Sequence, residues 1–237
     1  MYYRRRLAEV HAADYAQYAR AAAQLLVAEL EGPGVVIDLG CGAGDLCEPV
    51  RAAGFDYLGV DLSPDMVALA QRRFPDAAFR QGSAFDLPSL RGAAGIVAVG
   101  EVVNYATDPR AGASGLAAWL RECRQRLRPG GILLLDVAGP LRGDPEPTTT
   151  ITVAQDYRIA VTVSTDPGRR VLRRTITVDD GFGRDTEVHE LHLIDPVEVM
   201  AAFGQAGFEP TALQGYAPDL PFPRGWSGFL ARVILDT

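Results

Sequence analysis

A glycine-rich loop offers the clearest chemistry in this chain. The apolar run Val35–Leu39 contains one carboxylate, Asp38, and is followed by glycines at positions 40, 42 and 44. Glycine lets a ligand lie directly on the backbone because no Cβ intervenes, and the free N–H groups of a following helix can face that ligand. A dinucleotide fingerprint spaces its glycines G-x-G-x-x-G, whereas position 45 here is Asp. The loop therefore favours a nucleotide cofactor that lacks a pyrophosphate.

A second carboxylate follows the next apolar run. Residues 57–60 read as a buried strand that ends in Asp61, and an acidic residue at this strand tip can accept both hydroxyl hydrogens of a ribose. Ser63 then stands as the N-cap of a helix, with Pro64 at its first position. We therefore predict that Asp61 binds the ribose of the cofactor.

Strands and helices must alternate to position these groups. Further strand candidates cover residues 77–80, 96–99 and 132–137, with helical segments between them. Buried strands that alternate with helices predict a mainly parallel sheet covered on both faces. We therefore predict an α/β, Rossmann-like, doubly wound fold in one domain spanning residues 1–237.

Five motifs follow one another along this alternation. They are DLGCGAG (38–44), GVDLSPDM (59–66), GSAFDLP (82–88), GEVVNY (100–105) and LRPGGILLLD (127–136). In this order they resemble a class I S-adenosylmethionine-dependent methyltransferase over roughly residues 30–140. Residues 207–210 and 225–232 resemble the antiparallel strand pair that closes the sheet in that family. The resemblance implies a seven-stranded sheet and S-adenosyl-L-methionine as cofactor.

The resemblance also implies which residues bind the cofactor and the methyl acceptor. For the cofactor they are Tyr15, Asp38, Gly40, Cys41, Gly42, Gly44, Asp61, Leu62, Met66, Ser83, Ala84, Phe85, Gly100 and Glu101, and for the acceptor Tyr18, Asn104 and Tyr105. Many relatives carry an acidic residue at position 83, where the Ser83 hydroxyl can still bond the adenine amine. The adenine-methylating branch has paired prolines after the fourth strand, which residues 100–106 lack. That difference argues against a nucleobase methyltransferase of this type.

Histidines are the candidate general bases, because a hydroxyl or ammonium acceptor must lose a proton. The sequence contains His11, His189 and His192. His11 lies in the N-terminal segment that covers the cofactor in similar enzymes, so we rank it first, with His189 or His192 next. His189 and His192 are three positions apart on an expected strand, so they face opposite sides and cannot chelate one metal ion. We expect no metal site.

Two segments outside the shared motifs are the candidates for the acceptor site. The helical spacing of apolar residues at 22, 25, 26 and 30 predicts an N-terminal helix in residues 1–30, and the resemblance implies that this helix is a lid over the cofactor. Ordinary helix packing is the alternative role for Tyr15 and Tyr18. Residues 148–193 hold three or four alternating runs separated by turn signals, which predict an inserted antiparallel sheet. The resemblance to small-molecule methyltransferases implies that such a sheet roofs the acceptor pocket, and a role in oligomerisation is the alternative. Asp195, Pro196 and Glu198 then predict a capped helix.

Composition limits the partners that we expect. The net charge is −7 and all 23 basic residues are arginine, so an acidic chain of this kind is a poor default binder of nucleic acid. Neither a signal peptide nor an apolar run long enough to span a membrane is evident. The three cysteines, at positions 41, 47 and 123, make neither a disulfide framework nor a zinc cluster. We expect a cytoplasmic enzyme, with a homodimer left open.

The sequence thus predicts a methyltransferase that acts on nitrogen or oxygen of a small-molecule acceptor. Two other classes stay open. One is a catalytically silent S-adenosylmethionine-binding regulator or scaffold. The other is a nicotinamide oxidoreductase, which the glycine spacing disfavours.

Overall fold

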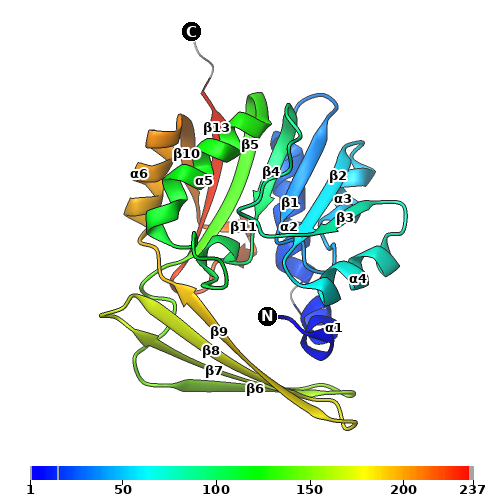
Figure 1. Cartoon of the computed structure of the whole chain (residues 1–237), viewed down its shortest axis with the longest axis vertical. Helices are drawn as coiled ribbons and strands as arrows, with labels where there is room; N and C mark the ends of the chain where they lie inside the picture. The colour runs from blue at the N-terminus through cyan, green and yellow to red at the C-terminus, as the bar shows by residue number, and fades with distance from the viewer. Residues whose placement is uncertain (1, 15, 235–237) are drawn as a thin grey trace.

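The apolar runs of the sequence form a central seven-stranded sheet. The computed structural model describes residues 2–14 and 16–234. Five parallel strands are β1 (Val35–Leu39), β2 (Asp56–Asp61), β3 (Ala78–Gln81), β4 (Ala93–Ala98) and β5 (Leu127–Ala138). Two antiparallel strands, β10 (Phe208–Leu213) and β13 (Trp226–Val233), complete the order β10-β13-β5-β4-β1-β2-β3 (Figure 1). The expected doubly wound sheet with an antiparallel closing pair is confirmed.

Helices cover both faces of this sheet. The helices are α1 (Arg5–Asp14), α2 (Ala16–Glu29), α3 (Cys47–Ala52), α4 (Pro64–Arg73), α5 (Ala113–Arg126) and α6 (Pro196–Ala206), with a short 3-10 helix, η1, at Val102–Asn104. Val36 of β1 packs with α2 and α3, whereas its neighbour Ile37 packs with α5 and α6. Both are fully buried. Successive strand residues point to opposite faces, so the continuous apolar run supplies both halves of the core.

The helix starts follow the capping signals of the sequence. The Ser63 hydroxyl accepts a hydrogen bond from the Met66 N–H, and Asp195 and Glu198 form a capping box at the start of α6. Each cap satisfies backbone donors that the first helical turn leaves free. These caps fix where α4 and α6 begin and confirm the predicted starts.

A crevice forms where strand order reverses. β1 and β4 are neighbours, and the helix that follows β1 lies on one face of the sheet while the helix that follows β4 lies on the other. The loops after these two strands therefore diverge and leave room for a ligand at the carboxyl edge. Gly40 and Gly100 occupy these two loops.

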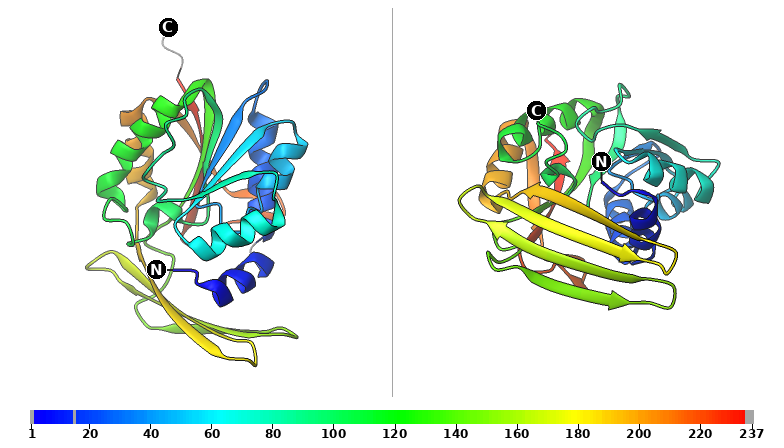
Figure 2. Two further views of the ribbon diagram at one scale, coloured as in Figure 1. Left: turned by 45° about the vertical axis from the view of Figure 1, so that its right-hand side comes forward. Right: turned by 60° about the horizontal axis from the view of Figure 1, so that its bottom comes forward.

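A separate antiparallel sheet lies across this carboxyl edge, as Figures 1 and 2 show. Its strands, in order, are β6 (Thr148–Val153), β7 (Arg158–Asp166), β8 (Val171–Asp179) and β9 (Arg184–His192). A bridge between Tyr105 and Leu191 joins it to the loop after β4. The predicted insertion therefore has four strands, and it faces the crevice.

The N-terminal segment differs from the prediction of one helix over residues 1–30. It forms two helices, α1 and α2, and Tyr15 lies outside the described residues. α1 packs against α4, whereas α2 packs on α3, β5 and the short hairpin β11 (Gly215–Ala217) and β12 (Leu220–Pro221). One straight helix extends along a single line, so it cannot follow both surfaces. The single-helix prediction is wrong for this reason.

Candidate active site

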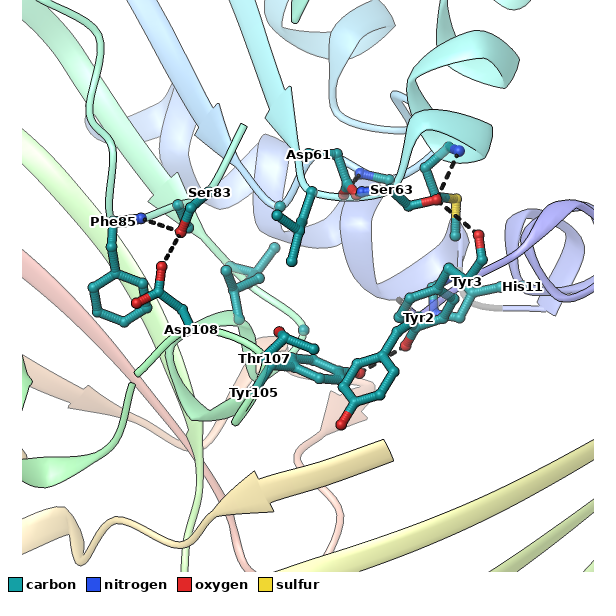
Figure 3. Close-up of a pocket in the computed structure, with 18 residues that line it drawn as sticks. Tyr2, Tyr3, His11, Asp61, Ser63, Ser83, Phe85, Tyr105, Thr107 and Asp108 are labelled. Carbon is teal, nitrogen blue, oxygen red and sulfur yellow. Dashed lines mark hydrogen bonds between the residues drawn. The ribbon is translucent and has the colours of Figure 1, made fainter. Parts of the chain in front are cut away.

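A first cavity opens at the carboxyl ends of β1, β2 and β4 (Figure 3). Nine residues that the resemblance assigned to the cofactor line it, namely Gly40, Gly42, Asp61, Leu62, Met66, Ser83, Ala84, Phe85 and Gly100. They converge because parallel strands end at the same edge of a sheet. The predicted cofactor residues are therefore brought together by the strand topology.

The glycine loop leaves open backbone at one position in particular. Gly42 has φ +52°, and apart from its chain neighbours no residue has an atom within 4 Å of the place where a Cβ would stand. A Cβ on Gly40, which has φ +78°, would lie 2.4 Å from a methyl group of Val102. Glycine at 40 thus allows close packing of the loop, while glycine at 42 leaves a surface on which a ligand can lie.

Asp61 connects the glycine loop to the start of α4. Its carboxylate accepts hydrogen bonds from the Gly42 N–H at 2.9 Å and from the Ser63 N–H at 2.8 Å. Burial raises the pKa of Asp61, and these two N–H groups oppose that rise. Each carboxylate oxygen has a second lone pair. Asp61 can therefore accept two further hydrogen bonds from a ribose diol.

Asp108 is a site residue that the sequence analysis missed. The Ser83 hydroxyl donates to the Asp108 carboxylate at 2.6 Å and accepts from the Phe85 N–H at 3.1 Å. Arg110 also binds this carboxylate, and its hydrogen bonds lower the pKa of Asp108 to about 2. The cavity therefore does hold an acidic group next to position 83. It comes from a distant loop, and no spacing signal in the sequence pointed to it.

Four described residues predicted to bind the cofactor lie outside the lining of the first cavity, and three of them serve the packing of the loop. Asp38 is buried and accepts a hydrogen bond from the Tyr57 hydroxyl at 2.6 Å. Cys41 is also buried. A Cβ on Gly44 would lie 3.0 Å from the ring of Phe79. Their place is beneath the cofactor loop rather than at its surface.

Replacing Asp38 with asparagine is expected to remove a pH dependence of stability. Burial raises the pKa of Asp38 to about 7, so the folded protein binds this proton more tightly than the unfolded chain does. The contribution is present below the unfolded pKa and is lost as pH rises through about 7, with about 1.4 kcal/mol lost for each pH unit that separates the folded and unfolded pKa values. Urea unfolding at pH 5 and pH 8 measures it. An equal change in the free energy of unfolding between pH 5 and pH 8 in the parent protein and in Asp38→Asn would contradict the protonated state of Asp38.

A second cavity of about 510 Å³ lies between the carboxyl edge and the inserted sheet. It shares Tyr3, His11, Gly100 and Tyr105 with the first cavity. Its apolar walls are Leu7 and Val10 of α1 together with Ile159, Val161, Val163 and Ile176 of the inserted sheet. The two cavities therefore adjoin, and α1 and the inserted sheet enclose the second one.

Glu101 lies in the second cavity rather than at the cofactor loop. Its backbone has φ +63°, a conformation that side chains disfavour. The Asp136 carboxylate holds it there by accepting the N–H groups of Gly100 and Glu101. The Glu101 carboxylate then pairs with Arg142 and Arg174. Burial alone would raise the pKa of Glu101, but these two guanidinium groups outweigh it and lower that pKa.

The two candidate histidines occupy different places. His11 lines both cavities, and its ring meets the ring of Tyr3 edge-on at 4.8 Å. Burial, with Arg174 next, lowers the pKa of His11 to about 4. His189 is fully buried and lines neither cavity. His11 is therefore the histidine that a bound ligand can reach.

Hydrogen bonds hold His189 within the inserted sheet. Its Nε2 lies 2.9 Å from the Glu187 carboxylate, and its ring stacks on Tyr2 at 4.1 Å. Burial lowers the pKa of His189 despite this carboxylate. His192 is less buried, in agreement with the prediction that the two histidines point to opposite sides.

The three residues predicted to bind the acceptor also occupy different places in the structure. Tyr105 lines both cavities, and its hydroxyl lies 2.7 Å from that of Tyr3. Asn104 is buried, and its amide bonds the backbone of Ala138 and His192, so it ties η1 to β5 and β9. Tyr18 packs on the ring of Trp226 at 5.1 Å and lines neither cavity. Of these three residues, only Tyr105 lines a cavity.

The segment before α1 spans the two cavities, which the sequence pattern did not indicate. The Glu187 carboxylate accepts the N–H groups of Tyr3 and Arg4 at 2.7 and 2.8 Å. The Ser63 hydroxyl donates to the carbonyl of Tyr3 at 2.7 Å. This segment is therefore attached to the inserted sheet on one side and to the start of α4 on the other.

Neither a metal site nor a membrane segment emerges from the part of the chain that the structure describes. No group of three or more His, Cys, Asp or Glu side chains there could hold a metal ion. No helix there is long and apolar enough to cross a membrane.

Comparison with known proteins decides the family. Residues 37–135 match a family described as methyltransferase domain. This chain belongs to the class I S-adenosylmethionine-dependent methyltransferases. The matched range covers the five motifs almost completely and includes the lining of the first cavity except Tyr2, Tyr3 and His11, so the family suggested by the sequence is confirmed.

Relatives extend this similarity over most of the methyltransferase. A ubiquinone biosynthesis O-methyltransferase from Azorhizobium caulinodans is 28% identical over 206 residues, which are 85% of this chain and 67% of the relative. An amino-sugar N,N-dimethyltransferase from Streptomyces venezuelae, acting on dTDP-3-amino-3,4,6-trideoxy-alpha-D-glucopyranose, is 27% identical over 85% of this chain and 86% of its own. The crystal structure of Streptomyces venezuelae DesVI superposes with a TM-score of 0.75, at 24% identity, over 93% and 92% of the two chains.

The first cavity of this methyltransferase fits S-adenosylmethionine. Gly42 offers open backbone, and the carboxylate of Asp61 has free lone pairs for a ribose. Ser83 and the nearby Asp108 supply acceptors for an adenine amine. Asp61 and Asp108 also bring negative charge to a cavity that must receive a cationic cofactor. The residues present therefore match the chemical groups of the cofactor.

Proposed function

We propose that this methyltransferase transfers a methyl group to nitrogen or oxygen of a small molecule bound in the second cavity. The observation that carries the proposal is the shared lining of the two cavities by Tyr3, His11, Gly100 and Tyr105. A group bound in one cavity is thereby adjacent to a group bound in the other. An in-line transfer requires this adjacency.

The chemistry that the residues must supply is limited. S-adenosylmethionine, when bound, supplies an electrophilic methyl group on a sulfonium. The walls formed by α1 and the inserted sheet hold the acceptor in line and exclude water, which can account for most of the acceleration. Because its pKa is about 4, His11 is neutral at pH 7, and a neutral imidazole can accept the proton of a hydroxyl or amine acceptor. We assign it the role of proton acceptor.

The proposal gives the two variable segments distinct roles. The inserted sheet contributes Thr150, Ile159 and Arg174, among others, to the second cavity and therefore acts as its roof. The segment before α1 covers the junction of both cavities through Tyr2 and Tyr3. Its hydrogen bonds to both Glu187 and Ser63 hold it over this junction as a cover.

The proposal includes both nitrogen and oxygen as the atom that receives the methyl group. The Azorhizobium relative is named for O-methylation and the Streptomyces relative for N-methylation. A catalytically silent cofactor-binding protein is the second candidate. The open volume of about 510 Å³ beside the cofactor cavity favours an acceptor-using enzyme over that candidate.

Transfer of a labelled methyl group to a panel of phenols, aliphatic amines and amino sugars tests the proposal. A cavity-filling variant, Val161→Trp, is expected to abolish transfer while S-adenosylhomocysteine still binds. The neighbouring Thr162 lies on the opposite face of β7, so Thr162→Trp is the matched control and is expected to retain turnover. Turnover that survives in Val161→Trp would place the acceptor elsewhere, and binding without any turnover across the panel would favour the silent protein.

A further inference from the structure

We propose that the acceptor carries an oxyanion, a carboxylate or a phosphoryl group, which Arg142 and Arg174 bind at one end of the second cavity. This inference rests on the proposed function, because it concerns the molecule held in that cavity. It follows from the balance of charges along the cavity wall. It also follows from the guanidinium N–H groups of Arg142 and Arg174 that donate no hydrogen bond to the described residues.

The described lining of the second cavity has more positive than negative charge. Arg142 and Arg174 are its cations, and Glu101 is its one carboxylate. His11 adds no charge at pH 7, because its pKa is about 4. The lining therefore has a net charge of about +1, in a protein whose total charge is −7.

Glu101 is shared between the two guanidinium groups and cannot balance both. One carboxylate oxygen accepts from Arg142 and the other from Arg174. Each guanidinium has five N–H donors, and no further hydrogen bond from either one is made to the residues that the structure describes. Donors therefore remain available on both arginines.

Nearby carboxylates are already engaged with other groups. Glu187 binds His189 and the N–H groups of Tyr3 and Arg4. Asp136 binds Tyr216 and the backbone at Gly100 and Glu101. Neither Glu187 nor Asp136 lines the second cavity. The protein thus supplies no second described carboxylate for these arginines.

Burial makes this excess charge significant. The side chain of Arg174 is 15% exposed and that of Arg142 is 24% exposed. A buried cation that lacks a full partner is costly, and a ligand anion that enters its hydrogen-bond reach removes that cost. Guanidinium groups also match the planar or tetrahedral geometry of carboxylate and phosphoryl oxygens.

The two arginines are held in place from different parts of the fold. Arg174 belongs to β8 of the inserted sheet, whereas Arg142 follows β5 and lies over the ring of Trp226 at 5.6 Å. Thr150 and Thr152 of β6 add hydroxyl groups to the same lining. An oxyanion bound here would join the roof to the central sheet, and the apolar walls would hold the remainder of the molecule.

Binding of small oxyanions tests the inference without knowledge of the acceptor. Benzoate and inorganic pyrophosphate serve as probes, benzamide is the neutral match of benzoate, and S-adenosylhomocysteine is present at saturation. Calorimetry is expected to show that at least one of the two oxyanions binds. A site for carboxylates is expected to bind benzoate more tightly than benzamide. A site for phosphoryl groups is expected to bind pyrophosphate more tightly than benzoate. No binding of either anion at 20 mM, set as roughly the upper limit for a specific site, would overturn the inference.

Opposite charge changes make the test specific. Arg142→Gln is expected to weaken oxyanion binding at least about tenfold, and Glu101→Gln is expected to strengthen it, because each changes the same local charge in opposite directions. Arg184→Gln removes a positive charge from an exposed position of the same sheet and is expected to leave binding unchanged. Equal oxyanion affinity in Arg142→Gln and the parent protein would overturn the inference. So would a large loss of S-adenosylhomocysteine affinity in Arg142→Gln with a parental melting temperature, because the arginine would then serve the cofactor.

Methyl transfer separates this inference from the proposed function. A panel with matched acceptors, such as 4-hydroxybenzoate with 4-hydroxybenzyl alcohol and glucosamine 6-phosphate with glucosamine, is expected to show turnover of the anionic member. Turnover of the neutral members alone would leave the proposed function standing and overturn the inference. Oxyanion binding that depends on Arg142, without turnover of any acceptor, would support the anion site and count against the proposed function.

Discussion

Replacing His11 with glutamine is expected to lower kcat by about a hundredfold, the lower end of the range for removing a general base. Glutamine keeps a hydrogen-bonding group of similar length but cannot take a proton at neutral pH. His11 lines both cavities and contacts Tyr3, so it is placed where the acceptor proton would leave. Steady-state kinetics with the best acceptor from the panel measures the effect, and the KM for S-adenosylmethionine is expected to change little.

The pH profile adds a second readout. With the pKa of His11 lowered to about 4, its neutral form persists through pH 5, and the activity of the parent protein is expected to lack an acid limb near pH 6.5 from this residue. Higher pH should partly restore the rate of His11→Gln, since the acceptor then ionises without help. His192→Gln is the matched control, because His192 lines neither cavity. An unchanged kcat in His11→Gln would show that the acceptor proton leaves to water or to another group.

Replacing Asp61 with alanine is expected to weaken S-adenosylhomocysteine binding by about a hundredfold or more. The variant loses two charge-assisted hydrogen bonds to the ribose, each worth about 1.5–3 kcal/mol. Asp56→Ala is the matched control, because it removes the same charge from the exposed start of β2. Calorimetry on both variants measures the difference. Parental affinity in Asp61→Ala would mean that this carboxylate does not bind the cofactor.

The structure indicates that Asp61→Ala also lowers the stability of the cofactor-free protein, which the sequence did not indicate. From the sequence, Asp61 is a ligand-binding residue alone, and its loss is expected to leave the cofactor-free protein as stable as before. In the structure it also accepts the N–H groups of Gly42 and Ser63. Leaving them unpaired costs about 1–3 kcal/mol each where they are buried, so we now expect a lower melting temperature as well. Asp61→Asn retains one acceptor oxygen and is expected to recover part of that stability without recovering the affinity.

The fold and the place of the cofactor follow from signals that are local in the sequence. Apolar runs such as Val35–Leu39, bounded by turn residues, predict strands buried on both faces, and parallel strands bring their carboxyl ends to one edge. Gly40, Asp61 and Gly100 therefore had to converge wherever the helices lay. The caps at Ser63 and Asp195 and the alternation across residues 148–193 are likewise local properties, which depend on neighbours a few positions away.

Which side chains meet across these elements depends on long-range packing. Asp108 pairs with Ser83, Glu187 holds the backbone of Tyr3, and Glu101 turns toward Arg174. These partners are far apart in the sequence, and each contact depends on how a loop or the inserted sheet lies on the central sheet. Spacing and periodicity describe one element at a time, so they carry no information on such pairs. The cofactor loop could be predicted because its geometry is local, whereas the acceptor cavity is a product of long-range packing.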